Sequence, residues 1–551
     1  MFKGNYKKLL CFILVLALTA CAFAMQSTAA DEPLIHSVTE LTAIDANDND
    51  TKTMEYHYDF GNIPTISAYQ GSNGTYALCV QQNDGSLKIL EVTAKGTVSS
   101  QLTVAKELDS YAAFTKGNDG SYYILFNKKL TSEQKSETAL RLVNYSQAGE
   151  RLREFNIPGN VSGSFLGVAE ISAGNNALCA NDNLITGYVG RYMFPDGSQT
   201  QHQASYAFAV DLKANKLIEV NHSAKSPYVS HSFHQFILKD GEDFVYVDRG
   251  DYLPFRSFRV SKMCGTSWTK NPDTYTGISG LVETEYKRGN SFRIKGVDGD
   301  NHTYSQLGGI VKTDSGYMLA GTYQNTTTDT APSSANVFVQ LFEIDSLSAQ
   351  KEIYLTNYTD SAQSLNKLTA TANNPKILSI NGNKVAVAYM LSNAAKNSEE
   401  MHIIFADGSG KLLENKTVAL ASGGSNLPRY GNVYYSSQKD SIVWFGIVNG
   451  KLIMNSVSLT DKAESTTGEI TTVDAETTTA KPETTTAKPE TTTAEPEATT
   501  AKPETTTAKP EATTEAPTEA PTEPKPQKPN FFQRVLNFFI KIYKWVISLF
   551  S

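Results

Sequence analysis

Paired apolar segments separated by polar turns recur along residues 31–462 of the chain. The first pair covers residues 76–80 and 87–92, with Asn83-Asp84-Gly85 between its two segments. Asp and Gly tolerate a positive φ, so this tripeptide predicts a tight hairpin turn. No stretch of this region shows the periodicity of a long amphipathic helix. The pattern therefore predicts an all-β body.

Seven such pairs occur. The other six are residues 122–126 with 139–143, 184–189 with 206–212, 244–247 with 258–260, 317–323 with 337–344, 385–390 with 401–405, and 442–448 with 452–457. Their first segments begin 46 to 73 residues apart, a spacing that fits the four-stranded blades of a β-propeller. We therefore predict a seven-bladed β-propeller, in which residues 35–60 supply a strand that closes the ring with the last blade. Two β-sandwich domains and a β-solenoid are the alternatives.

The N-terminal segment, residues 1–24, has the three-part layout of a secretory signal peptide. Three lysines within the first eight residues precede an apolar run and an A-x-A-like site that ends at Ala24. Cleavage after Ala24 is one interpretation. The other is that residues 18–21 form a lipobox, in which Cys21 receives a lipid. Both predict export, and hence an extracellular or cell-surface location.

A different composition begins at residue 463. Residues 476–510 are five copies of a seven-residue unit rich in Thr, Glu and Pro, and half of the 20 prolines lie between Pro482 and Pro529. No aromatic residue occurs from 463 to 530, so this segment has nothing with which to build a packed core. We predict that residues 463–529 form a disordered, Thr/Pro/Glu-rich stalk, whose threonines are candidates for O-linked sugars.

Residues 530–551 are predicted to form an amphipathic helix. Their polar side chains recur every three or four positions and make one narrow, partly basic stripe. Such a helix lies in a membrane interface and attracts anionic lipids. Packing against a partner helix and a short membrane span are the alternatives. The residues expected to contact the membrane are Phe531, Phe532, Leu536, Phe539, Trp545 and Phe550.

Two blocks of the body carry a family resemblance. Residues 308–322, followed by residues 337–345, resemble a blade of secreted bacterial β-propeller repeat proteins. Residues 228–236 with 247–251 are similar to a block in uncharacterised exported proteins of Gram-positive bacteria. The resemblance covers about the whole body and implies a propeller fold. It implies no activity and supplies no catalytic residues.

The most unusual local composition lies between residues 201 and 251, where four of the eight histidines fall within 33 residues. His, Asp and Arg side chains can bind metals, or hold sugars and carboxylates through charge-assisted hydrogen bonds. Because blade loops open on a few shared faces, these residues could converge on one mouth. Ordinary backbone hydrogen bonding is the alternative. The candidate ligand-binding residues are Arg191, Tyr192, His202, His231, His234, Gln235, Asp248, Arg249 and Asp251.

Net charge and cysteine content limit the possible functions. The formal net charge of −8 argues against nucleic-acid binding, which needs a basic face. The body holds only Cys79, Cys179 and Cys264, an odd number that does not suit a disulfide framework, and the first two are expected in buried strands. No cofactor is predicted. Residues 45–50 and 298–301 are weak calcium candidates, since each is more typical of a solvated turn.

The function that these features favour is display of a binding domain. The propeller would bind an extracellular glycan or protein, the stalk would project it, and the terminal helix would hold it at a membrane surface. A glycan hydrolase or lyase is the second hypothesis, and it predicts two or three acids and a His at the propeller axis. The third is a structural envelope protein without a diffusible ligand. No nucleophile elbow, zinc-protease motif or P-loop is present in the sequence.

Overall fold

The computed structural model describes residues 32–47, 63–130, 134, 136–159, 175–193, 202–220, 234–252, 255–263, 305–324, 333–360, 368–393 and 397–459. Within these ranges the chain forms β-strands and no α-helix, and so no helix there could cross a membrane. The chain divides into two units, Met1–Thr466 and Thr467–Ser551, and every described residue belongs to the first. The predicted signal peptide, stalk and terminal helix, with Cys21 and the membrane-contacting residues, lie outside the described residues.

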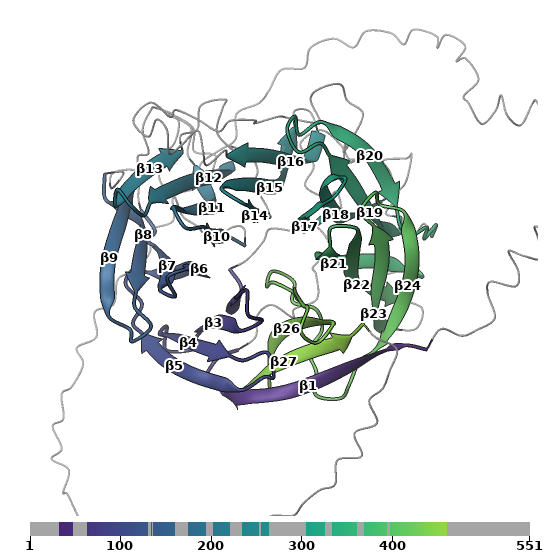
Figure 1. The fold of residues 1–551 in the computed structure, drawn as a ribbon, viewed down its shortest axis with the longest axis horizontal. Helices are drawn as coiled ribbons and strands as arrows, with labels where there is room; N and C mark the ends of the chain where they lie inside the picture. Colours follow the sequence, from purple (N-terminus) through teal and green to yellow (C-terminus); the bar gives the residue numbers. More distant parts are fainter. Residues whose placement is uncertain are drawn as a thin grey trace, which may run out of the picture. The chain divides into compact units, whose positions relative to one another are not determined.

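The strands form seven antiparallel blades arranged in a ring (Figure 1). The first blade contains β2 (Ile66–Gln70), β3 (Tyr76–Gln81), β4 (Leu87–Val92) and β5 (Val98–Val104). The second contains β6 (Ser110–Lys116), β7 (Tyr122–Asn127), β8 (Thr138–Tyr145) and β9 (Arg151–Pro158). The third contains β10 (Ala177–Ala180), β11 (Leu184–Met193), β12 (His202–Asp211) and β13 (Lys216–Val220).

The remaining blades follow the same order from the axis outward. The described part of the fourth contains β14 (Phe236–Asp240), β15 (Asp243–Tyr252) and β16 (Phe255–Met263). The fifth contains β17 (Gln306–Thr313), β18 (Gly316–Gln324), β19 (Ala335–Phe342) and β20 (Ala349–Tyr354). The sixth contains β21 (Thr371–Asn381), β22 (Lys384–Asn393), β23 (Ser398–Asp407) and β24 (Leu412–Ala419). The seventh contains β25 (Tyr434–Ser436), β26 (Ser441–Val448), β27 (Lys451–Ser458) and β1 (Leu34–Ala43).

The ring is closed by the N-terminal strand. β1 pairs antiparallel with β27 from His36 to Ala43 and forms the outer strand of the last blade. At its beginning, Leu34 and Ile35 also pair in parallel with β24 of the sixth blade. The predicted closing role of this segment is confirmed by β1. Joining the first strand to the last sequence repeat leaves no open end of the ring.

Hydrophobic clusters fill the spaces between neighbouring blades, and β3 shows how. Tyr76 and Leu78 point toward the seventh blade, where they pack with Phe445. Ala77 and Cys79, which alternate with them, point toward the second blade. Because successive side chains of a strand face opposite sides of the sheet, each blade presents an apolar surface to both neighbours. The middle strands are therefore nearly continuous apolar runs.

All seven strand pairs predicted from the sequence are present. They are the second and third strands of the seven blades: β3 with β4, β7 with β8, β11 with β12, β15 with β16, β18 with β19, β22 with β23, and β26 with β27. The predicted turn after β3 is also present. The backbone N–H of Ser86 donates to Oδ1 of Asp84 at 2.8 Å, and Gly85 has a φ of 84° that only glycine adopts easily.

Candidate ligand-binding site

The blade topology defines two faces of the ring. The first strand of each blade is innermost, and strand direction alternates from there outward. Turns after the second strands, and the connections between blades, therefore lie on the same face, which we call the connection face. Turns after the first and third strands lie on the opposite face. Side chains at the beginning of an inner strand are thus near the connection face.

The candidate residues that the structure describes belong to two adjacent blades. They lie in the halves of the third and fourth blades that are nearer the connection face: Arg191 and Tyr192 in β11, His202 in β12, His234 and Gln235 directly before β14, and Asp248, Arg249 and Asp251 in the second half of β15. His231 lies outside the described residues. Candidate residues that are close in the sequence are therefore also close in the propeller, on one face of two adjacent blades.

Three of these residues form a buried hydrogen-bonded network. The carboxylate of Asp248 accepts one hydrogen bond from the backbone N–H of His234, at 3.0 Å, and another from Nε2 of Gln235, at 3.3 Å. The backbone N–H of Gln235 donates to Oδ1 of Asn175 at 2.7 Å. None of the side chains of His234, Gln235 and Asp248 is more than 3 % exposed. The network therefore fixes the start of β14 inside the blade.

The imidazole of His234 and the side chain of Arg249 also lie inside the protein. Nδ1 of His234 lies 3.2 Å from the carbonyl oxygen of Leu307, so it donates there as the Nδ1–H tautomer. Arg249 is only 1 % exposed and lies within β15. The Arg-Gly-Asp tripeptide of residues 249–251 is therefore part of a strand, with its arginine buried. His234, Gln235, Asp248 and Arg249 are thus enclosed, so a ligand would meet this described part of the blade through residues that line an opening.

Such an opening lies at the axis, between the inner strands of five blades. It has a volume of about 580 Å³ and is bounded by β2, β6, β10, β14 and β25 with the segments that precede them. Its aromatic lining residues are Tyr69, Phe114, Phe236, Tyr430 and Tyr434. Its amide lining residues are Gln70, Asn175, Asn176, Gln235 and Asn432. A smaller hollow of about 90 Å³ shares Phe236, Ile237, Gly431 and Asn432 with this central cavity.

Hydrogen bonds between blades hold the cavity wall in place. Nε2 of Gln70 donates to the carbonyl oxygen of Tyr435 at 2.8 Å, across the seam where the ring closes. Nδ2 of Asn176, directly before β10, donates to the carbonyl oxygen of Ala112 in β6 at 3.5 Å, and this bond joins the third blade to the second. The hydroxyl of Tyr434 donates to the carbonyl oxygen of Ala68. Because each of these contacts is made between parts of the protein itself, the polar groups of the wall are held in fixed positions.

The described lining offers little acid–base or nucleophilic chemistry. It includes neither a carboxylate nor a histidine, whereas glycoside hydrolysis uses a pair of carboxyl groups. Burial raises the pKa of Cys179 to about 11, although Lys239 partly offsets this effect, so the thiol stays protonated at neutral pH. Burial likewise raises the pKa of Tyr69. These described groups suit binding by stacking and hydrogen bonding.

No metal cluster occurs in the described part of the chain, where no three His, Cys, Asp or Glu side chains are grouped to hold an ion. At the first calcium candidate, Oδ1 of Asp45 accepts from Nδ2 of Asn83 at 2.7 Å, and Asn47 donates to Asn83 at 3.1 Å. These contacts tie the segment to the turn after β3. Asn49, Asp50 and residues 298–301 lie outside the described residues.

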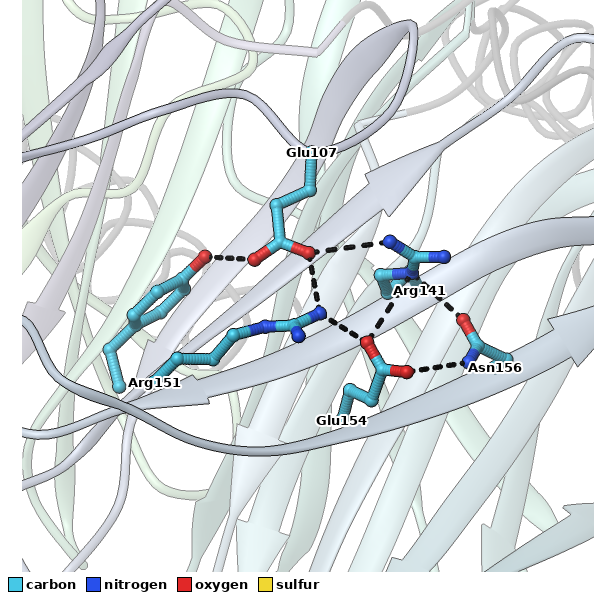
Figure 2. Close-up of polar contacts among 6 residues, drawn as sticks. Glu107, Arg141, Arg151, Glu154 and Asn156 are labelled. Carbon is cyan, nitrogen blue, oxygen red and sulfur yellow. Dashed lines mark hydrogen bonds and ion pairs between the residues drawn. The ribbon is translucent and has the colours of Figure 1, made fainter.

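A second polar cluster fastens the outer part of the second blade (Figure 2). Glu107, in the connection between β5 and β6, accepts from Arg151 at 2.8 Å and from Arg141 at 3.5 Å, and it also accepts from the hydroxyl of Tyr145. Arg151 donates to Glu154 as well. The two arginines balance the charges of the two glutamates. Because Glu107 bonds to residues of β8 and β9, the cluster joins the segment between β5 and β6 to the second blade.

The chain is similar to several solved structures at low sequence identity. No family model matches the chain, and no curated protein matches it. Among solved structures, a family PL25 ulvan lyase is 8 % identical, with a TM-score of 0.40 over 72 % of this chain and 94 % of its own. The BP39L lectin from Burkholderia pseudomallei is 12 % identical, with a TM-score of 0.38 over 73 % of this chain and 97 % of its own.

A third solved structure that is similar is Drosophila Plexin A in complex with Semaphorin 1b. It is 11 % identical, with a TM-score of 0.38 over 78 % of this chain and 88 % of its own. These three proteins are thus a polysaccharide lyase, a lectin and Plexin A. What defines the class of the present chain is its own structure: a seven-bladed β-propeller with a ligand-sized cavity at its axis.

Proposed function

We propose that this protein binds carbohydrate in the central cavity of its propeller. The observation that carries the proposal is the lining of that cavity of about 580 Å³, to which five aromatic and five amide residues contribute. Of these ten residues, Tyr69, Phe236, Tyr434, Gln70 and Asn432 are partly or fully exposed. This volume falls within the range of about 300–1,000 Å³ that is typical of small-molecule sites. It is large enough for a short segment or the end of a glycan chain.

The lining suits the two kinds of surface that a sugar presents. The C–H face of a pyranose packs on an aromatic ring, and Tyr69 and Phe236 offer partly exposed rings from different blades. The hydroxyl groups of a sugar need both donors and acceptors, and an amide side chain supplies both. Asn432 is exposed and Gln70 is half-buried, so their amides line the cavity without being sealed from it.

We further propose that this binding domain is part of a display protein. In this proposal the chain is exported through its N-terminal segment, residues 463–529 act as a spacer, and residues 530–551 attach the chain to a membrane surface. This arrangement rests on the composition of those segments. A tethered propeller would meet extracellular glycans at a distance from the surface that carries it.

A glycan-array screen with the full mature chain tests the proposal. Hits are then titrated by calorimetry against Asn432→Ala, which removes an exposed amide from the cavity wall, and against Gln101→Ala, an exposed amide on β5 as the matched control. We expect Asn432→Ala to weaken binding about tenfold and Gln101→Ala to leave it unchanged. A folded chain that binds no glycan, or glycan binding that ignores the Asn432 change, would overturn the proposal.

A further inference from the structure

Two lysine side chains bring positive charge to the axis of the propeller. Lys239 lies in β14, lines the central cavity and is exposed. Its ammonium group is near enough to Cys179, on the neighbouring inner strand β10, to lower the pKa of that thiol against the opposing effect of burial. Lys376 lies in β21 and lines the smaller hollow that adjoins the cavity. The two lysines therefore approach the axis from different blades.

Lys376 is held rigidly in this position. It is 4 % exposed, and its Nζ donates to the carbonyl oxygens of Arg429, at 2.8 Å, and Gly431, at 3.1 Å. Gly431 belongs to the walls of both the hollow and the central cavity. A charge fixed at the boundary of a region with low dielectric constant acts more strongly on a bound ion than one in bulk water.

Negative charge is absent from the described lining of both spaces. Asp248 is fully buried behind Gln235 and is not part of the lining. Asp240, next to Lys239 in β14, accepts from Nζ of Lys312 at 2.6 Å and from the hydroxyl of Tyr317 at 2.6 Å. The described lining of these two spaces therefore carries positive charge only, in a chain whose formal net charge is −8. A recess lined by one sign of charge concentrates ligands of the opposite sign.

From this charge distribution we infer that the carbohydrate is acidic, with carboxylate or sulfate groups that Lys239 and Lys376 recognise. The inference rests on the proposed function and specifies its ligand class. The aromatic rings would bind the apolar faces of the sugar, and the lysines would select for its anionic groups. Both uronic acids and sulfate esters present oxygen atoms that an ammonium group can bind.

Calorimetric titration of the full mature chain tests this inference. The three probes are a uronic-acid oligosaccharide, a sulfated oligosaccharide and a neutral oligosaccharide of the same length. We expect at least one acidic probe to bind about tenfold more tightly than the neutral one. That advantage should shrink as ionic strength rises from about 0.01 M to about 0.15 M, because screening shortens the Debye length. The pair of acidic probes shows whether carboxylate or sulfate is preferred.

Charge variants locate the effect. Lys239→Gln should remove most of the acidic preference and flatten the salt dependence, whereas Lys239→Arg should retain both. Lys95→Gln, at an exposed lysine in the turn between β4 and β5, is the control and should change neither. Lys376→Met should act like Lys239→Gln. Because it also removes the donor to two buried carbonyls and could unfold the chain, the Lys239 pair decides the question alone.

The outcomes separate the ligand class from the function. If neutral and acidic probes bind equally well, or if Lys239→Gln leaves the acidic preference intact, this inference is wrong while carbohydrate binding stands. If no carbohydrate binds to the folded chain, both the proposed function and this inference are wrong. An acidic preference that depends on Lys239 and on ionic strength supports both.

Discussion

The imidazole of His36, in the closing strand β1, stacks on the indole of Trp444 in β26, with ring centroids 5.1 Å apart and planes 8° from parallel. Nδ1 of His36 accepts a hydrogen bond from the backbone N–H of Ala421 at 3.0 Å. Nε2 therefore carries the proton and donates to Oδ1 of Asn455 at 3.1 Å. A neutral histidine thus joins the N-terminal strand to the last blade and to the segment before it.

This arrangement predicts a loss of stability in mild acid. Burial lowers the pKa of His36 below its ordinary value of 6.5, and the hydrogen bond to Asn455 only partly offsets this. The unfolded chain therefore takes up a proton before the folded chain does. The stabilisation is complete above about pH 6.5 and declines as the pH falls from there toward the folded pKa.

Urea denaturation at a series of pH values measures this effect, with His36→Phe as the test variant. Phe keeps an aromatic ring against Trp444 but cannot be protonated, so the decline below pH 6.5 should become shallower. His402 also has a pKa lowered by burial, and His402→Phe is the matched comparison. An identical pH dependence in His36→Phe and the unchanged chain would contradict the role given to His36.

Trp444 is predicted to be a major contributor to the stability of the closing blade. It is fully buried, and its Nε1 donates to the carbonyl oxygen of Ser425 at 3.2 Å. Trp444→Ala should lower the free energy of unfolding by about 3–5 kcal/mol, because it leaves a cavity. Leu152→Ala, at a side chain that is 52 % exposed, should change it by less than about 0.5 kcal/mol. Thermal and urea unfolding of both variants provide the measurement.

The cluster around Glu107 (Figure 2) should contribute more than an isolated surface ion pair. The side chain of Glu107 is 16 % exposed and bonds to two arginines and a tyrosine. Glu107→Gln preserves its shape, removes its charge and should cost about 1–2 kcal/mol in unfolding free energy. Lys451→Gln breaks a more exposed pair with Glu40 and should cost less than about 0.5 kcal/mol. Equal effects would mean that the cluster adds nothing beyond ordinary surface pairing.

Gly308 is predicted to be intolerant of any side chain. A Cβ atom at this position would lie 2.8 Å from the carbonyl oxygen of Pro375, where β17 and β21 of adjacent blades approach each other. Gly308→Ala should destabilise the chain by about 1–3 kcal/mol, because backbone must move to relieve the contact. The urea midpoint measures this cost, and an unchanged midpoint would show that the two blades separate easily.

The sequence was sufficient to predict the middle strands of every blade and the overall ring. Residues 76–80 and 442–448, for example, are buried by neighbouring blades on both faces, so they are almost continuously apolar. Such runs stand out without any tertiary information. Polar turns such as Asn83-Asp84-Gly85 are local as well, because their backbone angles depend on the residues themselves.

The residues of the candidate site could be predicted only in part from the sequence. The histidine-rich composition led to His234, Gln235 and Asp248, and the structure brings these three residues together, but in a buried network. The composition of a segment does not reveal whether its polar groups bond to one another or to a ligand. That distinction depends on burial, which the surrounding blades determine.

The inner strands, which line the cavity, were not predicted. β2, β10 and β14 are only four or five residues long, and their side chains are unevenly buried because each strand has an open axis on one side. They lack the apolar periodicity that reveals a strand in a sequence. The cavity residues are far apart in the chain, and none belongs to a recognisable motif, as Tyr69, Asn175, Lys239 and Asn432 show. They share one cavity only because ring closure brings the inner strands of different blades to a common axis, and this long-range condition exists only in the tertiary structure.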